Sequence, residues 1–123
     1  DVLLIFMNDR NSNTSVKAAK ALKTPINRCP VHVQNRFELI ENTAIQAIER
    51  FRRTNQETKD KVYGAIVYML GDVAKQIVAI DHLQRLRTVV SNLDPHDDAY
   101  YTLTDAVEST LEIIDNKLEQ AAL

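Results

Sequence analysis

Apolar side chains recur every three or four residues over most of the chain, most clearly after residue 30. An α-helix has about 3.6 residues per turn, so side chains at this spacing share one face of a helix. The pattern predicts an all-α domain in which each helix buries one stripe. Four helices are expected, at 31–53, 55–80, 81–93 and 95–121.

Two glycines interrupt the second predicted helix. Gly64 and Gly71 are seven residues apart and therefore lie on nearly the same side of it. Glycine in a helix interior costs about 1 kcal/mol relative to alanine. A close helix crossing compensates for this cost, because a residue without a side chain lets two backbones approach. We therefore expect another helix to cross at these two positions.

Capping residues mark the starts of the last three predicted helices. Thr54 and Glu57 have the spacing of a capping box, in which the two side chains satisfy orphan backbone donors. Asp81 is expected to cap the third helix. Asp94 and Pro95 predict the start of the fourth, because aspartate caps a helix and proline suits its first turn.

The first thirty residues give a weaker pattern. We expect residues 1–30 to be an N-terminal leader or appendage and residues 31–123 to be the helical domain. The apolar run Val2–Met7 fits either a short strand or a short helix. The polar stretch Asn8–Ser15 is typical of a loop, and Val16–Lys23 is typical of a weak basic helix.

The composition supports the all-α prediction. With 2 glycines and 3 prolines in 123 residues, the chain has too few turn residues for a β-sandwich, a β-barrel or a phosphate-binding loop. Apolar residues make up 45% of the chain and charged residues 26%, which is typical of a globular protein and excludes wholesale disorder. A chain of this length is expected to bury one core.

Charge is distributed unevenly along the chain. The net charge of −2 provides no general field for holding a nucleic acid, so no nucleic-acid partner is expected. Residues 1–36 carry six basic and two acidic side chains, whereas residues 94–123 carry one basic and eight acidic side chains. This distribution is typical of a solvated helix face, and it also allows the acidic end to pair with the basic end or with a basic partner.

Redox and targeting signals favour a cytoplasmic protein. Cys29 is the only cysteine, which excludes an internal disulfide and a cysteine-based metal cage. The apolar run at residues 2–7 is too short to span a bilayer, and no basic region or cleavage site of a signal peptide accompanies it. We expect no membrane association.

No set of residues in the sequence points to catalysis. The chain has no nucleophile elbow, no recognisable acid and base pair, and no cofactor loop. His32, His82 and His96 lie in three separate segments, without the spacing of a metal site. We therefore predict no catalytic residue, no metal and no cofactor, and a protein that is not an enzyme.

Two stretches of the chain resemble the globin family. Residues 33–51 are similar to the opening helices of bacterial-type globins, in the stretch VQNRFELIENTAIQAIERF. Residues 83–111 resemble the proximal helix and the helix after it, in the stretch LQRLRTVVSNLDPHDDAYYTLTDAVESTL. The resemblance covers roughly residues 31–118 and implies a globin-like helical domain. This domain is reduced between the first and second long helices, because a longer globin segment is missing between Phe51 and Thr54.

The resemblance implies a domain without haem. The position of the proximal histidine falls on Val90, and valine cannot ligate haem iron. The implied ligand pocket consists of Thr58, Val62, Met69, Leu86 and Val90. The implied function is a haem-free sensory or regulatory domain that binds a small apolar ligand or a partner protein and signals through helix packing.

Other interpretations remain open. A haem-binding globin for oxygen or redox sensing would use His82 or His96 as the iron ligand. A helical protein-interaction module would bind protein alone. The resemblance also implies a homodimer that forms through the last two long helices, because the corresponding helices of globin-like sensors pair with one another.

Overall fold

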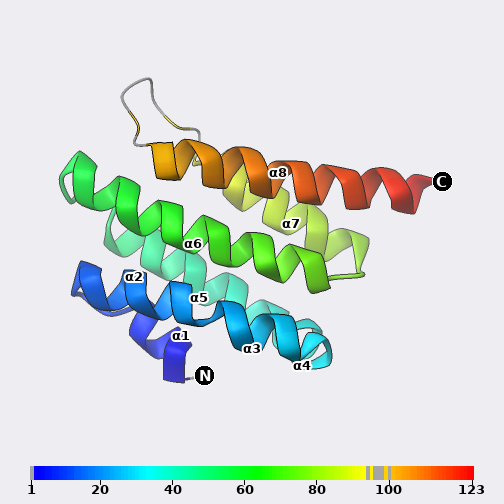
Figure 1. Ribbon diagram of the computed structural model, residues 1–123, viewed down its shortest axis with the longest axis horizontal. Coiled ribbons are helices and arrows are strands. Elements are labelled where there is room, and N and C mark those ends of the chain that lie inside the picture. The colour runs from blue at the N-terminus through cyan, green and yellow to red at the C-terminus, as the bar shows by residue number, and fades with distance from the viewer. Residues whose placement is uncertain (1, 94, 96–98, 100) are drawn as a thin grey trace.

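The computed structural model of the chain describes residues 2–93, 95, 99 and 101–123. Within these residues it contains eight α-helices and no strand (Figure 1), so the all-α prediction is confirmed. The helices are α1 (Val2–Met7), α2 (Ser12–Ala21), α3 (Lys23–Arg28), α4 (Pro30–Asn35), α5 (Phe37–Arg50), α6 (Gln56–Gln76), α7 (Ile80–Ser91) and α8 (Tyr101–Ala122). No helix in this part of the chain combines the length and the apolar character needed to cross a membrane.

Helix α6 lies at the centre of the fold. It packs against α2, α3 and α4 on one side and against α8 on another, with α5 and α7 behind it in Figure 1. Of its 21 residues, 13 are buried, so α6 is enclosed on most sides rather than along one stripe. The amphipathic helices around it bury their apolar faces against it. The hydrophobic core therefore follows the axis of α6.

Residues 2–30, expected as a leader, fold as α1, α2 and α3 and join the same core. Their buried apolar side chains are Leu4, Met7, Ala18, Ala19, Leu22 and Ile26. The run Val2–Met7 is a helix, one of its two expected forms. The expected loop Asn8–Ser15 is shorter than predicted, because the Asn11 side chain accepts a hydrogen bond from the backbone of Thr14 and starts α2 at residue 12.

All four predicted helices have different bounds in the structure, and the third, expected at 81–93, spans Ile80–Ser91. The helix expected at 31–53 is divided at Arg36, which separates α4 from α5. The helix expected at 55–80 ends at Gln76, because Ile77 takes an extended backbone with φ −86° and ψ 134°. Ile77 is fully buried, so the extended backbone keeps its side chain in the core.

The predicted capping box of α6 is wrong. Asn55 caps this helix, and its side chain accepts a hydrogen bond from the Thr58 backbone N–H at 2.8 Å. The Thr54 hydroxyl instead donates to the carbonyl of Phe51 at 2.7 Å, within the preceding turn. Asparagine and threonine are both good capping residues, and here the second of two neighbouring candidates takes the position.

The cap predicted at Asp81 is also wrong. The residue before α7 is Ala79, whose side chain makes no capping hydrogen bond, and α7 begins at residue 80. The carboxylate of Asp81 therefore lies in the first turn of the helix, where a negative charge is favourable. Asp94 lies outside the described residues, but Pro95 and Ala99 are described and are not helical. The fourth helix, expected from residue 95, therefore begins later, at Tyr101.

The close crossing predicted at Gly64 and Gly71 is confirmed. A Cβ atom at Gly64 would lie 3.2 Å from Cγ2 of Thr102, and one at Gly71 would lie 2.8 Å from Oγ1 of Thr110. Both threonines belong to α8, which therefore crosses α6 at the two glycines. The Thr110 hydroxyl also donates to the carbonyl of Val67 at 3.1 Å and ties the two helices together there.

Lys117 of α8 caps the carboxyl end of α6. Its ammonium group donates to the carbonyl oxygens of Ala74, Lys75 and Ile77, at 3.0, 2.9 and 2.6 Å. The last carbonyls of a helix have no partner within the helix, and a cation is favourable at this negative end of the helix dipole. The threonine crossing and this lysine cap together fix α8 along α6.

Candidate functional site: a groove along α6

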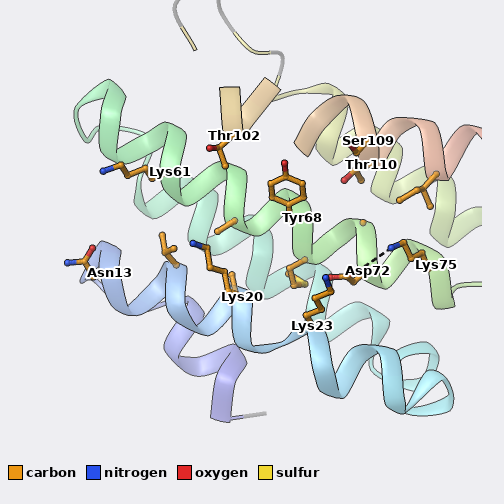
Figure 2. A pocket seen from close by; sticks show the side chains of 16 residues that line it. Asn13, Lys20, Lys23, Lys61, Tyr68, Asp72, Lys75, Thr102, Ser109 and Thr110 are labelled. Atoms are coloured by element: carbon orange, nitrogen blue, oxygen red, sulfur yellow. Dashed lines mark ion pairs between the residues drawn. The ribbon is translucent and has the colours of Figure 1, made fainter. Parts of the chain in front are cut away.

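A groove with a volume of about 730 Å³ runs along α6, between α2 and α3 on one side and α8 on the other (Figure 2). Ligand pockets in proteins commonly have volumes of about 300–1,000 Å³. The groove falls within this range, and its three sides come from segments far apart in the sequence. It is therefore a candidate binding site that exists only in the folded chain.

The floor of the groove is one face of α6. Lys61, Ala65, Tyr68, Asp72 and Lys75 line it, at alternating spacings of four and three residues. This spacing places all five side chains on the same side of the helix. Lys61 and Lys75 are fourteen residues apart, and a helix rises about 1.5 Å per residue, so the floor is roughly 21 Å long.

The two walls of the groove differ in charge. The α2–α3 wall is partly basic and consists of Asn13, Val16, Ala19, Lys20 and Lys23. The α8 wall carries hydroxyl and apolar side chains, from Thr102, Ser109, Thr110 and Ile113. Figure 2 shows the resulting arrangement: four lysines border the groove, two on α6 and two on the opposite α2–α3 wall.

The groove lysines are all exposed, and two of them have acidic neighbours on α6. Lys61 lies 3.3 Å from Glu57, and Lys75 lies 3.6 Å from Asp72. The Lys61–Glu57 pair is exposed on both sides, and such a pair within one helix contributes little to stability, so an acidic ligand can replace it at small cost. Asp72 is buried, so it remains beside Lys75. The two lysines of the α2–α3 wall form no ion pair with any residue that the structure describes. The groove therefore offers its positive charge to an anionic partner.

Tyr68 lies in the middle of the groove floor and points toward α8 (Figure 2). Its hydroxyl donates a hydrogen bond to the carboxylate of Asp105 on α8. This hydrogen bond, together with partial burial, raises the pKa of Tyr68 to about 12. Tyr68 is therefore a polar link between the floor and the α8 side of the groove.

The raised pKa of Tyr68 predicts a loss of stability at high pH. Ordinary tyrosine has a pKa of about 10, so the hydrogen bond to Asp105 stabilises the fold fully below about pH 10 and is lost as the pH rises through about 12. The free energy of unfolding should fall more over this range in the wild-type protein than in Tyr68→Phe. Urea denaturation at several pH values measures the difference, and an equal fall in both proteins would contradict the prediction.

Of the five residues that the globin resemblance implies as a ligand pocket, Met69 lines the groove. Val62, Leu86 and Val90 are fully buried in the hydrophobic core. Thr58 lies in the first turn of α6, where its backbone N–H is bound by the helix cap. The structure therefore brings Met69 to a cavity and places the other four in the core or at a helix end.

Sequence reasoning missed Tyr68 and the two lysines of the α2–α3 wall. Lys17, Lys20 and Lys23 follow one another at three-residue spacing, which indicates a basic helix face. This signal was available in the sequence. It did not identify a site, because nothing in the leader indicated that its helices pack against α6.

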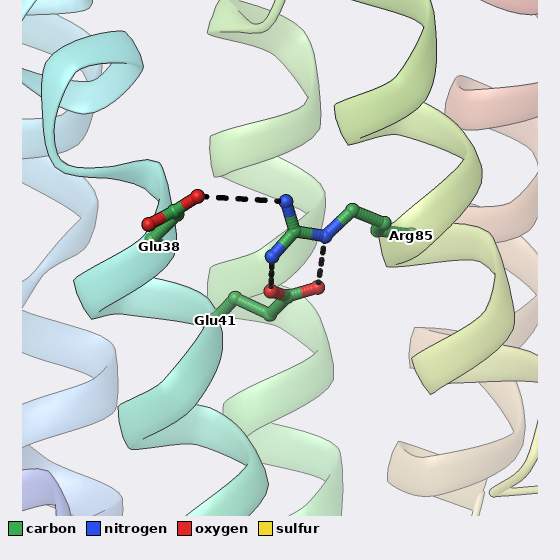
Figure 3. A network of polar contacts seen from close by, with 3 residues as sticks. All are labelled: Glu38, Glu41 and Arg85. Atoms are coloured by element: carbon green, nitrogen blue, oxygen red, sulfur yellow. Dashed lines mark hydrogen bonds and ion pairs between the residues drawn. The ribbon is translucent and has the colours of Figure 1, made fainter.

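A second polar cluster joins α5 to α7 (Figure 3). Arg85 Nε donates to Glu41 at 3.2 Å, another guanidinium nitrogen contacts the second oxygen of Glu41, and Glu38 lies 3.9 Å away. The hydrogen bond to Glu41 raises the pKa of Arg85. His82 stacks on Phe37 with 4.1 Å between the ring centroids. Glu41 is buried, and a buried carboxylate needs such a partner, so this cluster holds two helices together.

The described residues contain no group of three or more histidine, cysteine, aspartate or glutamate side chains that could hold a metal ion. His96, one of the two histidines considered as a haem ligand, lies outside these residues. Comparison of the chain with family models, curated proteins and solved structures finds no match. The groove, with its shape and charge, is therefore the feature from which a function can be inferred.

Proposed function

We propose that this domain is a non-catalytic regulatory binding module whose groove along α6 receives an acidic amphipathic helix from a partner protein. The observation that carries the proposal is the placement of four lysines around the groove. Partner binding would act on the packing between α6 and α8, because both helices line the groove.

The shape of the groove favours a helix as its occupant. A floor of roughly 21 Å corresponds to about four helical turns. In helix-in-groove recognition, an amphipathic helix lays its apolar stripe between helices of the receptor. Val16 on α2 and Ile113 on α8 are partly exposed and provide apolar surface for such a stripe, with Ala65 and Met69 almost fully buried beneath them.

The spacing of the lysines favours several acidic groups over a single one. Lys61 and Lys75 lie at opposite ends of the groove floor, and Figure 2 shows Lys20 and Lys23 between them along the groove. A single carboxylate reaches one end only, whereas a helix with acidic residues on both edges of its apolar stripe pairs with all four. Such exposed pairs contribute more to orientation and association rate than to affinity.

We also propose that the domain has a globin-like fold and binds no haem. The support is the sequence resemblance over residues 33–51, in α4 and α5, and residues 83–111, which include most of α7 and the first half of α8. Val90, at the position of the proximal ligand, is fully buried in the core and offers no ligand for iron.

A peptide titration tests the proposal. The probe is a designed helical peptide of about fifteen residues, with leucines on one stripe and glutamates along both edges. Fluorescence anisotropy should show binding that weakens as salt is added. The double variant Lys20→Glu and Lys23→Glu should weaken binding about tenfold or more, because two attractive contacts become repulsive.

A matched control reverses two exposed charges outside the groove, Lys17→Glu and Arg28→Glu. The net charge changes by the same amount, so affinity should stay within about twofold of the wild-type value. An equal loss in both double variants would mean that the peptide senses net charge alone and would overturn the proposal. The homodimer expected from the resemblance is tested by sedimentation, and a dimer that dissociates in the groove variant would identify a second copy as the occupant.

A further inference from the structure

A second pocket, with a volume of about 310 Å³, opens between α1, α3, α4 and α5. Its inner surface is formed by buried apolar side chains, from Leu4, Leu22, Ile26, Val33, Ile40 and Met69. Pro25, Cys29, His32 and Arg36 also line the pocket and are exposed, so they form its outer edge, with the polar groups at the mouth and the aliphatic side chains inside. A pocket of this kind accommodates an apolar molecule that reaches it from solvent.

Met69 is the residue that this pocket and the groove share. It lines both cavities from α6 and is almost fully buried. Methionine has an unbranched, flexible side chain that adapts to irregular space in a core. A molecule that displaces the Met69 side chain from one cavity therefore changes the shape of the other.

We infer that this pocket binds a small uncharged apolar molecule, and that its occupancy weakens partner binding in the groove through Met69. The lining selects the ligand, because aliphatic side chains favour an apolar body and the volume lies at the small end of the range for ligand pockets. The coupling rests on the proposed function of the groove, whereas the binding of the small molecule does not.

The coupling has a defined physical basis. Filling the pocket moves the Met69 side chain toward the groove floor, where the apolar stripe of the partner helix would pack. The small molecule and the partner then favour different positions of one side chain, which is the requirement for coupling between two sites. By linkage, the partner must weaken binding of the small molecule by the same factor.

Indole is the probe for the pocket. The chain contains no tryptophan, so the fluorescence of bound indole is observed without a tryptophan background. Cys29 is the only cysteine, is exposed and lines the pocket, so its alkylation by N-ethylmaleimide reports occupancy at this place. We expect saturable indole binding that slows alkylation of Cys29 by about tenfold at saturation, while alkylation of free glutathione stays unchanged.

The coupling is measured by repeating the peptide titration with saturating indole. We expect indole to weaken peptide binding about fivefold in the wild-type protein and in the volume-conserving variant Met69→Leu, and to have no effect in Met69→Ala. If Met69→Ala does not fold, Met69→Val, which also shortens the side chain, replaces it. In the wild-type protein, saturating peptide must weaken the affinity for indole, measured by protection of Cys29, by the same factor.

The outcomes separate this inference from the proposed function. If indole does not bind, or binds without protecting Cys29, the inference that this pocket is a binding site is wrong, whatever the result of the peptide titration. Indole binding with unchanged peptide affinity overturns the coupling. A peptide that fails to bind in the absence of indole overturns the proposed function, and indole protection of Cys29 then still decides whether the pocket is a site.

Discussion

Replacing Gly71 with leucine should lower the free energy of unfolding by about 2–3 kcal/mol, because the new side chain overpacks the α6–α8 interface. A Cβ atom at this position would lie 2.8 Å from Oγ1 of Thr110. Thr110 is buried and its hydroxyl donates to the carbonyl of Val67, so it cannot move without leaving that buried hydroxyl without its acceptor. Urea denaturation of Gly71→Leu and the wild-type protein measures the change.

Gly64→Ala and Gly71→Ala provide the matched pair for this prediction. A Cβ atom at Gly64 meets the methyl group of Thr102 at 3.2 Å, and Thr102 is exposed and can adjust. Gly64→Ala should therefore be close to neutral, because alanine also favours the helix. Gly71→Ala should destabilise the fold. Unchanged stability in Gly71→Leu would show that the two helices are not held at this crossing.

Replacing Lys117 with methionine should lower the free energy of unfolding by about 1–3 kcal/mol, because the end of α6 loses a charged hydrogen-bond donor. The Lys117 ammonium satisfies the carbonyls of Ala74, Lys75 and Ile77. Methionine keeps much of the side-chain volume and removes the donor and the charge. Thermal and urea denaturation should both detect the loss.

Lys61→Met is the control for this prediction. Lys61 is exposed and pairs with Glu57 on its own helix, so its replacement should change stability by less than about 0.5 kcal/mol. Equal effects of Lys61→Met and Lys117→Met on the free energy of unfolding would mean that the Lys117 cap on α6 does not stabilise the fold. A selective effect of Lys117→Met would place the carboxyl end of α6 among the main contacts that hold the groove together.

The fold could be predicted from the sequence where the signal was local. The seven-residue separation of Gly64 and Gly71 predicted a close crossing, because a glycine needs a compensating contact inside a helix. The sequence did not identify α8 as the crossing helix, because Thr102 and Thr110 are about forty residues away along the chain. The predicted capping residue of α6 is wrong for a similar reason. The sequence alone does not show which of two neighbouring capping residues has the backbone conformation that a helix cap needs.

The candidate site was less predictable than the fold. The globin resemblance gives Met69 a place in a ligand pocket, and Met69 does line a cavity. Lys20 and Lys23 were assigned to a leader, so their position opposite Lys61 and Lys75 could not be anticipated. A groove made by three separate segments has no continuous sequence signature, because its residues come together only through tertiary packing.

The position at which the acidic peptide binds is the most direct test of the proposed function. Two-dimensional NMR of isotopically labelled protein, recorded during the peptide titration, reports changes at each backbone amide. The proposal predicts that the largest shifts fall on the groove-facing residues of α2, α3, α6 and α8, and that they diminish in the Lys20→Glu and Lys23→Glu variant. Shifts concentrated on α7 or on the outer face of α1 and α5, or no shifts at saturating peptide, would contradict it.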